Sequence, residues 1–356
     1  MAMANECSVE YKKVSDFLDR CQGRKLLIQT HDIPDPDALA SAEAFRVFAK
    51  SRGISARIVV NGLPHRHENL ALIKECKIPM TMLGNLNIKN PDKYRWAYID
   101  CFPGNRNVTL HRYAPGDDFV AIDHHRKSLR RKRLRTEGVL ISNPGAGATA
   151  TILTSLLFTG EVIPPVRLAS ALSYAIITDT MDFSRGTAQE DLDSFKMLFP
   201  YTNQRIISRL RNATKSRHYF QTMRRSLDKA AFYRHVAWAN MGVVSGGEIA
   251  AEMADFILTC ERISWSLALG FCGSRLYMSL RSSNPKAQCG LVIARLLEHR
   301  RGAAGGHDQF AGGFIELGSS VDADRIADEV IERFVRILLR IPQKEPVPEG
   351  TLLAGE

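Results

Sequence analysis

The triplet Asp123-His124-His125 directly follows the apolar run 119–122. One carboxylate and two imidazoles therefore emerge together where a predicted β-strand ends, which is the edge at which open α/β sheets bind their ligands. Five further side chains of the same types occur along the chain, most of them at the end of an apolar segment: His31, Asp35, Asp37, Asp100 and Asp179. Together with the triplet they predict a centre that holds two metal ions.

The heptapeptide 31–37, His-Asp-Ile-Pro-Asp-Pro-Asp, is the most informative segment. Each proline disfavours helical geometry in the residue before it, so Asp35 should be extended. In an extended chain, residues two apart point the same way, which aims Asp35 and Asp37 at one point. Two adjacent carboxylates need cations to neutralise them, and His31 adds a nitrogen ligand. Alternatively, Asp37 only caps a helix that begins at Ala38, which leaves His31 and Asp35 unexplained.

A pair of divalent ions about 3.5–4 Å apart would supply a nucleophile at neutral pH and a clamp for phosphoryl oxygens. Aspartate and histidine ligands without thiolates suit Mn²⁺, with Mg²⁺ as the alternative and Zn²⁺ less suitable. Taken alone, Asp100 and Asp179 would be interpreted as turn or cap residues. Their assignment as ligands depends on the rest of the set.

The first half of the chain alternates short apolar runs with helical patterns. The runs predict strands over 26–28, 57–60, 96–99, 119–122 and 139–141, and the patterns predict helices over 38–49, 148–158 and 166–177. Such alternation is typical of a mainly parallel sheet with crossover helices. We therefore expect an N-terminal α/β metal-binding domain over residues 1–195.

The second half predicts a smaller C-terminal α/β domain over 231–341, joined by a helical basic linker over 196–230. Strands are predicted over 236–239, 264–270, 276–280 and 313–317, and helices over 248–259, 287–298 and 322–339. A glycine-rich loop precedes the last strand. The tail 342–356 contains proline and glycine and is expected to be disordered.

Composition limits the class of protein. A chain of 356 residues suits about two domains. Its apolar stretches are shorter than the roughly 20 residues that a membrane span needs, and no signal peptide is evident, so we expect a cytoplasmic protein without a membrane partner. Seven cysteines without a C-x-x-C pair argue against a disulfide framework and a zinc knuckle. Cys101, next to Asp100, is interpreted as a packing residue rather than a nucleophile.

The formal net charge of +10 favours anionic partners. Much of the excess lies in the basic runs 126–135 and 205–225. The first run is either a solvated face or a strip that follows phosphates near the metal centre. His65 and His67 are interpreted as surface loop residues.

The motifs of the first half, taken in order, resemble the DHH phosphoesterase family. They are His31-x-x-Pro34-Asp35-x-Asp37-Ala38, Asp100, Asp123-His124-His125 and Thr178-Asp179-Thr180. The resemblance implies one metal held by His31 and Asp35, a second held by Asp37 and His124, and a bridge between them by Asp100. It further implies that Asp179 completes the first site. His125 would face the scissile phosphate, and Asp123 would orient the imidazoles from behind.

The second half resembles the DHH-associated domain, in which an arginine and a Gly-Gly-Gly-His segment bind substrate across a cleft from the metals. The resemblance implies an active site in the interdomain cleft and five substrate-binding residues: Arg281, Ser282, Gly305, Gly306 and His307. Without the resemblance, a glycine-rich loop with one histidine is usually only a turn. The chain departs from the family pattern at Ala304, where a glycine is usual, and at Pro36, which replaces a glycine and should stiffen its loop.

We therefore expect an Mn²⁺-dependent hydrolase that cleaves phosphoester bonds with water activated by two metals. One metal domain plus one DHH-associated domain most resembles the nanoRNase and pAp (3′-phosphoadenosine-5′-phosphate) phosphatase group. The expected substrates are short single-stranded RNA or DNA, degraded as by a 3′–5′ exonuclease, and the nucleotide bisphosphate pAp. The alternatives are a polyphosphatase or pyrophosphatase, a soluble linear or cyclic dinucleotide phosphodiesterase, and a catalytically inactive nucleotide- or RNA-binding protein. The sequence does not determine the oligomeric state, and a homodimer is one of the options.

Overall fold

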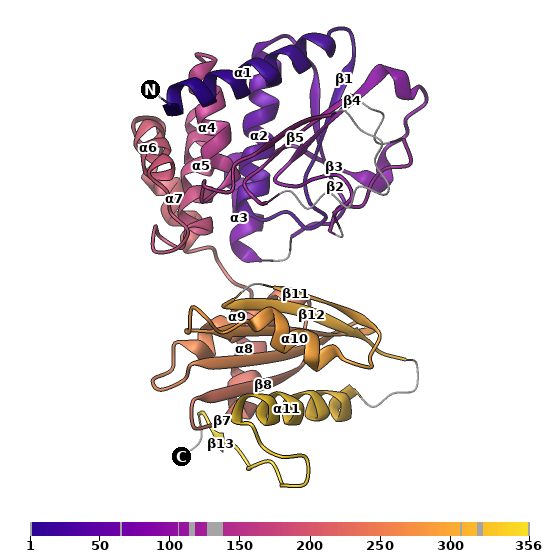
Figure 1. Cartoon of the computed structure of the whole chain (residues 1–356), viewed down its shortest axis with the longest axis vertical. Coiled ribbons are helices and arrows are strands. Elements are labelled where there is room, and N and C mark those ends of the chain that lie inside the picture. Colours follow the sequence, from indigo (N-terminus) through magenta and orange to yellow (C-terminus); the bar gives the residue numbers. More distant parts are fainter. Residues whose placement is uncertain are drawn as a thin grey trace. The chain divides into compact units, whose positions relative to one another are not determined.

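The computed structural model describes residues 2–64, 66–105, 107–113, 118–126, 138–306, 308–318 and 323–354, with side chains from residue 9 onward. The chain divides into two compact units, Met1–Ala213 and Thr214–Glu356 (Figure 1). This division falls inside the segment that we expected to be a helical linker. His65, His307 and most of the basic run 126–135 lie outside the described residues.

The first unit contains a six-stranded sheet of order β3-β2-β1-β4-β5-β6, and every neighbouring pair is parallel. The strands are β1 (Lys25–Gln29), β2 (Ala56–Val60), β3 (Met80–Met82), β4 (Tyr94–Ile99), β5 (Phe119–Asp123) and β6 (Val139–Ser142). The order of the strands reverses between β1 and β4, so this pair forms the topological switch point where such sheets bind ligands. The expected parallel sheet is confirmed.

Helices cover one face of this sheet. They are α1 (Ala2–Arg20), α2 (Pro36–Ser51), α3 (His67–Cys76), α4 (Thr149–Thr159), α5 (Val166–Asp179), α6 (Gln189–Leu198) and α7 (Gln204–Arg211), with a 3₁₀ turn, η3 (Phe199–Tyr201), before α7. Of these, α1, α2 and α4 pack directly on the strands, whereas α5 packs against α2 and α4 (Figure 1). Successive strand residues point to opposite faces, so Leu26 and Ile28 pack in the core under the helices.

The opposite face of the sheet has a second, smaller core. Leu27, Trp96 and Tyr98 pack there against Leu83 and Ile88. Leu83 lies in the 3₁₀ turn η1 (Leu83–Asn85), and a second 3₁₀ turn, η2 (Pro91–Lys93), precedes β4. Irregular chain segments therefore cover this face where helices cover the other.

The second unit contains a seven-stranded mixed sheet of order β11-β12-β10-β9-β8-β7-β13. Its strands are β7 (Ala231–Tyr233), β8 (Val236–Val243), β9 (Trp265–Cys272), β10 (Arg275–Ser282), β11 (Gly302–Gly306), β12 (Phe310–Glu316) and β13 (Thr351–Leu352). Only β8 and β9 run parallel among the described pairs. Helices α8 (Arg217–Lys229) and α9 (Gly247–Leu258) pack on one face, and α10 (Cys289–Leu297) and α11 (Ala323–Leu339) pack on the other.

Two segments of the second unit differ from expectation. The glycine-rich stretch Gly302–Gly306 is strand β11, because glycines let its backbone lie close to β12: a Cβ on Gly306 would come 2.3 Å from the Phe310 carbonyl oxygen. The tail that was expected to be disordered returns to the sheet, where Thr351 and Leu352 pair with the edge strand β7. The open edge of β7 supplies the backbone partners that proline and glycine content alone did not reveal.

Among the described helices, none is both long and apolar enough to span a bilayer. The described cysteines, from Cys21 onward, are free thiols.

Candidate metal centre

The predicted ligands converge at one edge of the first sheet. His31, Asp100 and the pair Asp123-His124 stand at or just after the carboxyl ends of β1, β4 and β5, which are consecutive strands in the sheet. Asp35 and Asp37 lie at the start of α2, and Asp179 is the last residue of α5. The structure therefore gathers at the switch point all six side chains that the sequence predicted as metal ligands.

A first donor set consists of His31, Asp35 and Asp100. One ligand atom from each lies within 4.8 Å of the others. The His31 Nε2 atom is 3.9 Å from Asp35 Oδ1 and 3.7 Å from Asp100 Oδ2. This arrangement offers one nitrogen and two carboxylates to a single ion.

A second donor set consists of Asp37, His124 and Asp179, again within 4.8 Å. The His124 Nε2 atom is 3.3 Å from Asp179 Oδ2 and 3.9 Å from Asp100 Oδ1. Asp100 therefore presents one oxygen to each set, the position of a bridging carboxylate. The implied place of Asp179 needs correction, because its carboxylate lies with the second set and not with His31 and Asp35.

The start of α2 explains how two nearby aspartates serve different sets. Asp35 is extended, as predicted, and its side chain caps α2 by accepting a hydrogen bond from the Ala38 amide at 3.0 Å. Pro36 begins the helix, since its fixed φ suits the first helical position, so Asp37 is helical. The expectation that Asp35 and Asp37 point at one site is therefore wrong, and the cap is Asp35.

The start of α4 holds the Asp37 carboxylate. The amides of Thr149 and Ala150 donate to its two oxygens at 2.7 and 2.8 Å, and Asp37 is only 2% exposed. Unpaired amides and the positive end of the helix dipole both favour an anion at this position. A carboxylate held by two amides is fixed in orientation before any cation binds.

Thr149 connects three of the predicted ligands, and sequence reasoning missed it. Its hydroxyl donates to Asp100 Oδ1 at 2.8 Å and accepts the His124 amide at 3.2 Å, while its own amide holds Asp37. A threonine at the start of a predicted helix was a weak signal for such a role, because residues of this type often bond to backbone groups at helix starts.

The two histidines of the triplet have different partners. The Nδ1 atom of His124 lies 3.2 Å from the Ala146 carbonyl, which can only accept, so this bond leaves Nε2 with a lone pair for a metal. His125 directs Nδ1 to Asp123 Oδ1 at 2.8 Å, and its side chain is 58% exposed. Among the described residues, Asp123 bonds to His125 and not to the His124 imidazole, which corrects the expectation that it orients both.

The backbone of Asp100 is strained. Its φ of 58° lies in the left-handed region, which non-glycine residues seldom adopt and which recurs at functional sites. Its amide donates to the Ile122 carbonyl of the neighbouring strand at 2.8 Å. This hydrogen bond holds the strained turn, and the turn aims the carboxylate between the two donor sets.

The cluster concentrates negative charge in a poorly solvated place. Burial, reinforced by Asp37 and Asp35, holds the pKa of Asp100 well above its usual range, and burial with the same neighbours raises the pKa of Asp179 to about 9. Burial also opposes ionisation of Asp35, but the nearby His31 imidazole outweighs it and lowers the pKa to about 2. Divalent cations would remove the repulsion among these carboxylates.

The donor set fits Mn²⁺ or Mg²⁺. All its atoms are carboxylate oxygens or imidazole nitrogens, which suit these ions. Cys101 offers no thiolate, since its buried sulfur donates to the Gln29 carbonyl at 3.7 Å and burial raises the pKa of the thiol well above its usual range. Two sets that share Asp100 would hold two ions better than one.

Four of the five predicted substrate-binding residues, those that the structure describes, lie on neighbouring strands of the second unit. Arg281, next to last in β10, pairs with Phe310 of β12, and Gly305 and Gly306 pair with the other edge of β12. The Arg281 Nε atom donates to Asp255 Oδ1 at 2.5 Å, a partner that sequence reasoning missed. Ser282 is buried and donates to the Ser264 carbonyl.

We compared the chain with known protein families, sequences and structures. No protein-family model matches the chain. An uncharacterized protein from Methanocaldococcus jannaschii is 28% identical over 334 residues, which cover 92% of this chain and 66% of that protein's length. The chain thus spans slightly less than two thirds of that curated relative.

Two solved structures match nearly all of the chain. An exopolyphosphatase-related protein from Bacteroides fragilis has a TM-score of 0.71 and 17% identity, covering 94% of this chain and 98% of its own. RecJ from Thermus thermophilus, crystallised with Mn²⁺, has a TM-score of 0.51 and 14% identity, covering 94% of this chain and 55% of RecJ. The fold is the DHH-type two-domain fold. The fold expected from the sequence motifs is therefore confirmed.

Proposed function

We propose that this protein is a phosphoester hydrolase of the DHH family that depends on two divalent metal ions. One observation carries the proposal: two donor sets that share Asp100 converge at the switch point of the parallel sheet. The Mn²⁺ in the RecJ crystal structure, whose fold this chain shares, supports Mn²⁺ as the metal, with Mg²⁺ as the alternative.

In this proposal, His31, Asp35 and Asp100 hold one ion, and Asp37, Asp100, His124 and Asp179 hold the other. Bound ions of this kind supply Lewis acidity and an activated water for attack on phosphorus. His125 acts on the substrate, because it is exposed and held by Asp123. The hydrogen bond to Asp123 raises the pKa of His125 despite its partial burial, which favours the imidazolium form that donates to a phosphoryl oxygen.

We further propose short oligonucleotides and pAp as substrates. The exposed face of α8 supports a nucleic-acid partner: Phe220, 63% exposed, lies between the exposed Arg217 and Arg224 along the helix. An aromatic ring beside arginines can stack on a base while the cations contact phosphates. Arg281, Ser282, Gly305, Gly306 and His307 are proposed to bind the substrate.

Polyphosphate is the second candidate substrate. The exopolyphosphatase-related protein shares the fold over most of both chains, and the net charge of +10 suits any polyanion. Polyphosphate has no ring to stack on Phe220, so an exposed aromatic residue among arginines favours a nucleotide.

A substrate panel tests the proposal. The protein is incubated with Mn²⁺ and RNAs of two to five nucleotides, pAp, cyclic di-AMP or polyphosphate, and products are separated by chromatography. We expect mononucleotides from RNA, AMP and phosphate from pAp, and no products with chelator. Hydrolysis of polyphosphate alone would refute the nucleotide assignment, and no hydrolysis under any divalent ion would refute the enzyme assignment.

A further inference from the structure

A cavity of about 390 Å³ opens in the first unit, away from the metal centre. It lies at the amino-terminal ends of β1, β2 and β4, where Lys25, Ala56 and Tyr94 are the first residues. The predicted metal ligands His31 and Asp100 follow the opposite ends of β1 and β4. His31 is six positions after Lys25, which amounts to about 20 Å in an extended chain.

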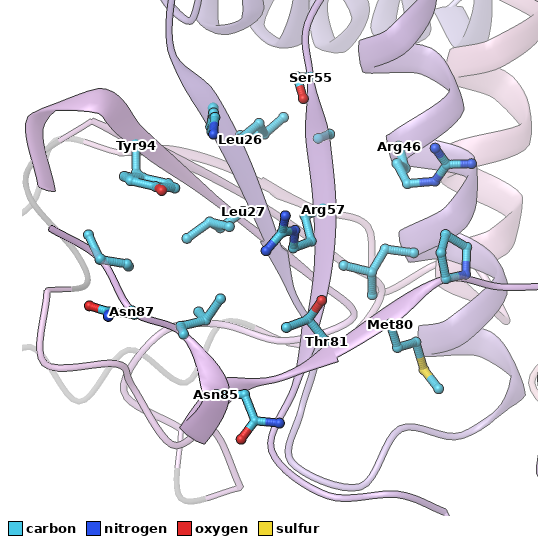
Figure 2. Close-up of a pocket in the computed structure, with 16 residues that line it drawn as sticks. Leu26, Leu27, Arg46, Ser55, Arg57, Met80, Thr81, Asn85, Asn87 and Tyr94 are labelled. Carbon is cyan, nitrogen blue, oxygen red and sulfur yellow. The ribbon is translucent and has the colours of Figure 1, made fainter. Parts of the chain in front are cut away.

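The strand register places one wall of this cavity on the face that irregular segments cover. Lys25 pairs with Tyr94, and Leu27 pairs with both Trp96 and Arg57. Paired residues of adjacent strands point to the same face, so Leu27, Arg57 and Tyr94 share that face (Figure 2). The register places Lys25 on the same face. Figure 2 shows Asn85 and Asn87 on the segment that borders the cavity there.

The charged residues that line the cavity are all basic: Lys25, Arg46 and Arg57. None of the described residues that line the cavity is acidic. Arg46 is paired with Glu43 through two bonds of 2.7 Å, but Lys25 and Arg57 form no ion pair within the described part of the chain. Lys25 lies two positions before Leu27, the residue that pairs with Arg57 on the neighbouring strand. Two cationic side chains at this spacing can reach one phosphate group.

The remaining lining suits a base and a ribose. The apolar part of the lining includes the nearly fully buried Leu27 and Ile88, and the half-buried Tyr94 offers a ring for stacking. The carboxamides of Asn85 and Asn87 each donate and accept hydrogen bonds, as the edge of a base requires. A cavity of this volume is in the range of roughly 300–1,000 Å³ that small-molecule sites occupy.

We propose that this cavity binds a nucleoside monophosphate, with Lys25 and Arg57 on the phosphate and Tyr94 against the base. The site is separate from the metal centre and does not depend on the hydrolytic activity proposed above. Ser55 and Thr81, which also line the cavity, supply hydroxyl groups for the ribose.

Binding of AMP and UMP is measured by calorimetry in chelator, which keeps metal ions from the Asp100 cluster. We expect binding that Arg57→Gln and Lys25→Gln each weaken by at least about tenfold, the effect of losing one charge-assisted hydrogen bond. Inorganic phosphate and adenosine should each bind at least tenfold more weakly than AMP. The matched control Lys196→Gln, on the exposed side of α6, should bind AMP as the unmodified protein does.

Several results would overturn this site. Absence of AMP and UMP binding would do so, as would equal affinity in the unmodified protein and both cavity variants. Loss of binding in Asp100→Asn but not in Arg57→Gln would place the nucleotide at the metal centre instead. Phosphate binding as tight as AMP would leave an anion site without nucleotide recognition. Thermal unfolding of each variant checks that the fold is retained, which the exposure of Arg57 and Lys25 favours.

Discussion

Asp100 is the residue that joins the two donor sets. Its oxygens face His31 on one side and His124 on the other, and its left-handed backbone holds the carboxylate in that position. The sequence predicted Asp100 as a ligand only because the other predicted ligands occur in the same chain. A single aspartate at the end of a strand has no distinctive signal. The structure shows what the sequence could not: each carboxylate oxygen of Asp100 lies within 4 Å of the Nε2 atom of a different histidine, His31 or His124.

Thr149 orders this centre through its hydroxyl, so its loss should weaken metal binding. We predict that Thr149→Ala lowers Mn²⁺ affinity by about 10–100-fold, the usual effect of removing a partner of metal ligands. The free energy of unfolding should fall by about 1–2 kcal/mol, because Asp100 and the His124 amide lose a buried hydrogen-bond partner. Calorimetric titration with Mn²⁺ and thermal unfolding measure the two effects.

Thr149→Ser is the matched control, since serine retains the hydroxyl. It should keep Mn²⁺ affinity within about threefold, because its bonds to Asp100 and the His124 amide can persist. If Ala and Ser variants bind Mn²⁺ equally, the hydroxyl does not position the ligands.

The raised pKa of Asp179 predicts a pH dependence of the metal-free protein. In the folded chain the pKa rises from its ordinary 3.8 to about 9, so the folded state holds more protons than the unfolded state between these values. Stability should therefore fall as pH rises from 5 to 9 in chelator. Thermal unfolding measures it, and the gain in Tm on adding Mn²⁺ should grow with pH, because the ion replaces the proton.

Asp179→Asn tests the source of this slope. The amide cannot ionise, so the fall in Tm between pH 5 and 9 should be shallower than in the unmodified protein. An identical slope in both proteins would show that Asp179 does not titrate in this range.

At the level of elements, apolar periodicity predicted the helices and strands whose residues are mostly buried. The strands over 96–99 and 119–122 match the buried parts of β4 and β5, and the helix over 166–177 matches α5. The patterns missed β11, whose small residues lack strand propensity. Its pairing depends on contact with β12, which lies beyond the reach of a local pattern.

The loop that leads into α4 is fixed by a buried aspartate on α6. Asp191 accepts hydrogen bonds from the Gly147 amide at 2.9 Å, the Thr151 hydroxyl at 2.6 Å and the Ala188 amide at 2.7 Å. We predict that Asp191→Ala lowers the free energy of unfolding by about 3 kcal/mol, because it leaves buried donors unpaired. It should also weaken Mn²⁺ binding, since the displaced helix start carries Thr149. Chemical denaturation measures the first effect and titration the second.

Asp193→Ala on the same helix is the control. Asp193 lies at the surface with Lys196, so its removal should change the free energy of unfolding by less than about 0.5 kcal/mol. Equal destabilisation by both variants would refute the special role of Asp191.

For the whole molecule, the sequence predicted two α/β units but not the second sheet's outer strands. The first unit gathers the six predicted metal ligands, and the second holds Arg281 on strand β10. The sequence motifs could suggest that Arg281 binds substrate. They could not show its bond to Asp255, because α9 and β10 approach only in the folded unit.

Kinetics can separate a substrate-binding role of Arg281 from a structural one. If Arg281 binds substrate, Arg281→Lys should raise KM for a dinucleotide by about tenfold, because lysine lacks the planar fork of arginine. The kcat and the Mn²⁺ affinity should stay within about threefold. Arg275→Lys, at the exposed start of the same strand, should leave KM unchanged. A lower Tm with an unchanged KM would make Arg281 only the structural partner of Asp255.

The most direct test of the metal centre is a calorimetric titration of the chelator-treated protein with Mn²⁺, compared with Asp100→Asn. Two ions per chain should bind the unmodified protein. The variant should bind Mn²⁺ at least about 100-fold more weakly, because both donor sets lose their shared carboxylate and the loss exceeds that of an outer partner. Absence of Mn²⁺ and Mg²⁺ binding, or equal binding by both proteins, would contradict a two-metal centre built on Asp100.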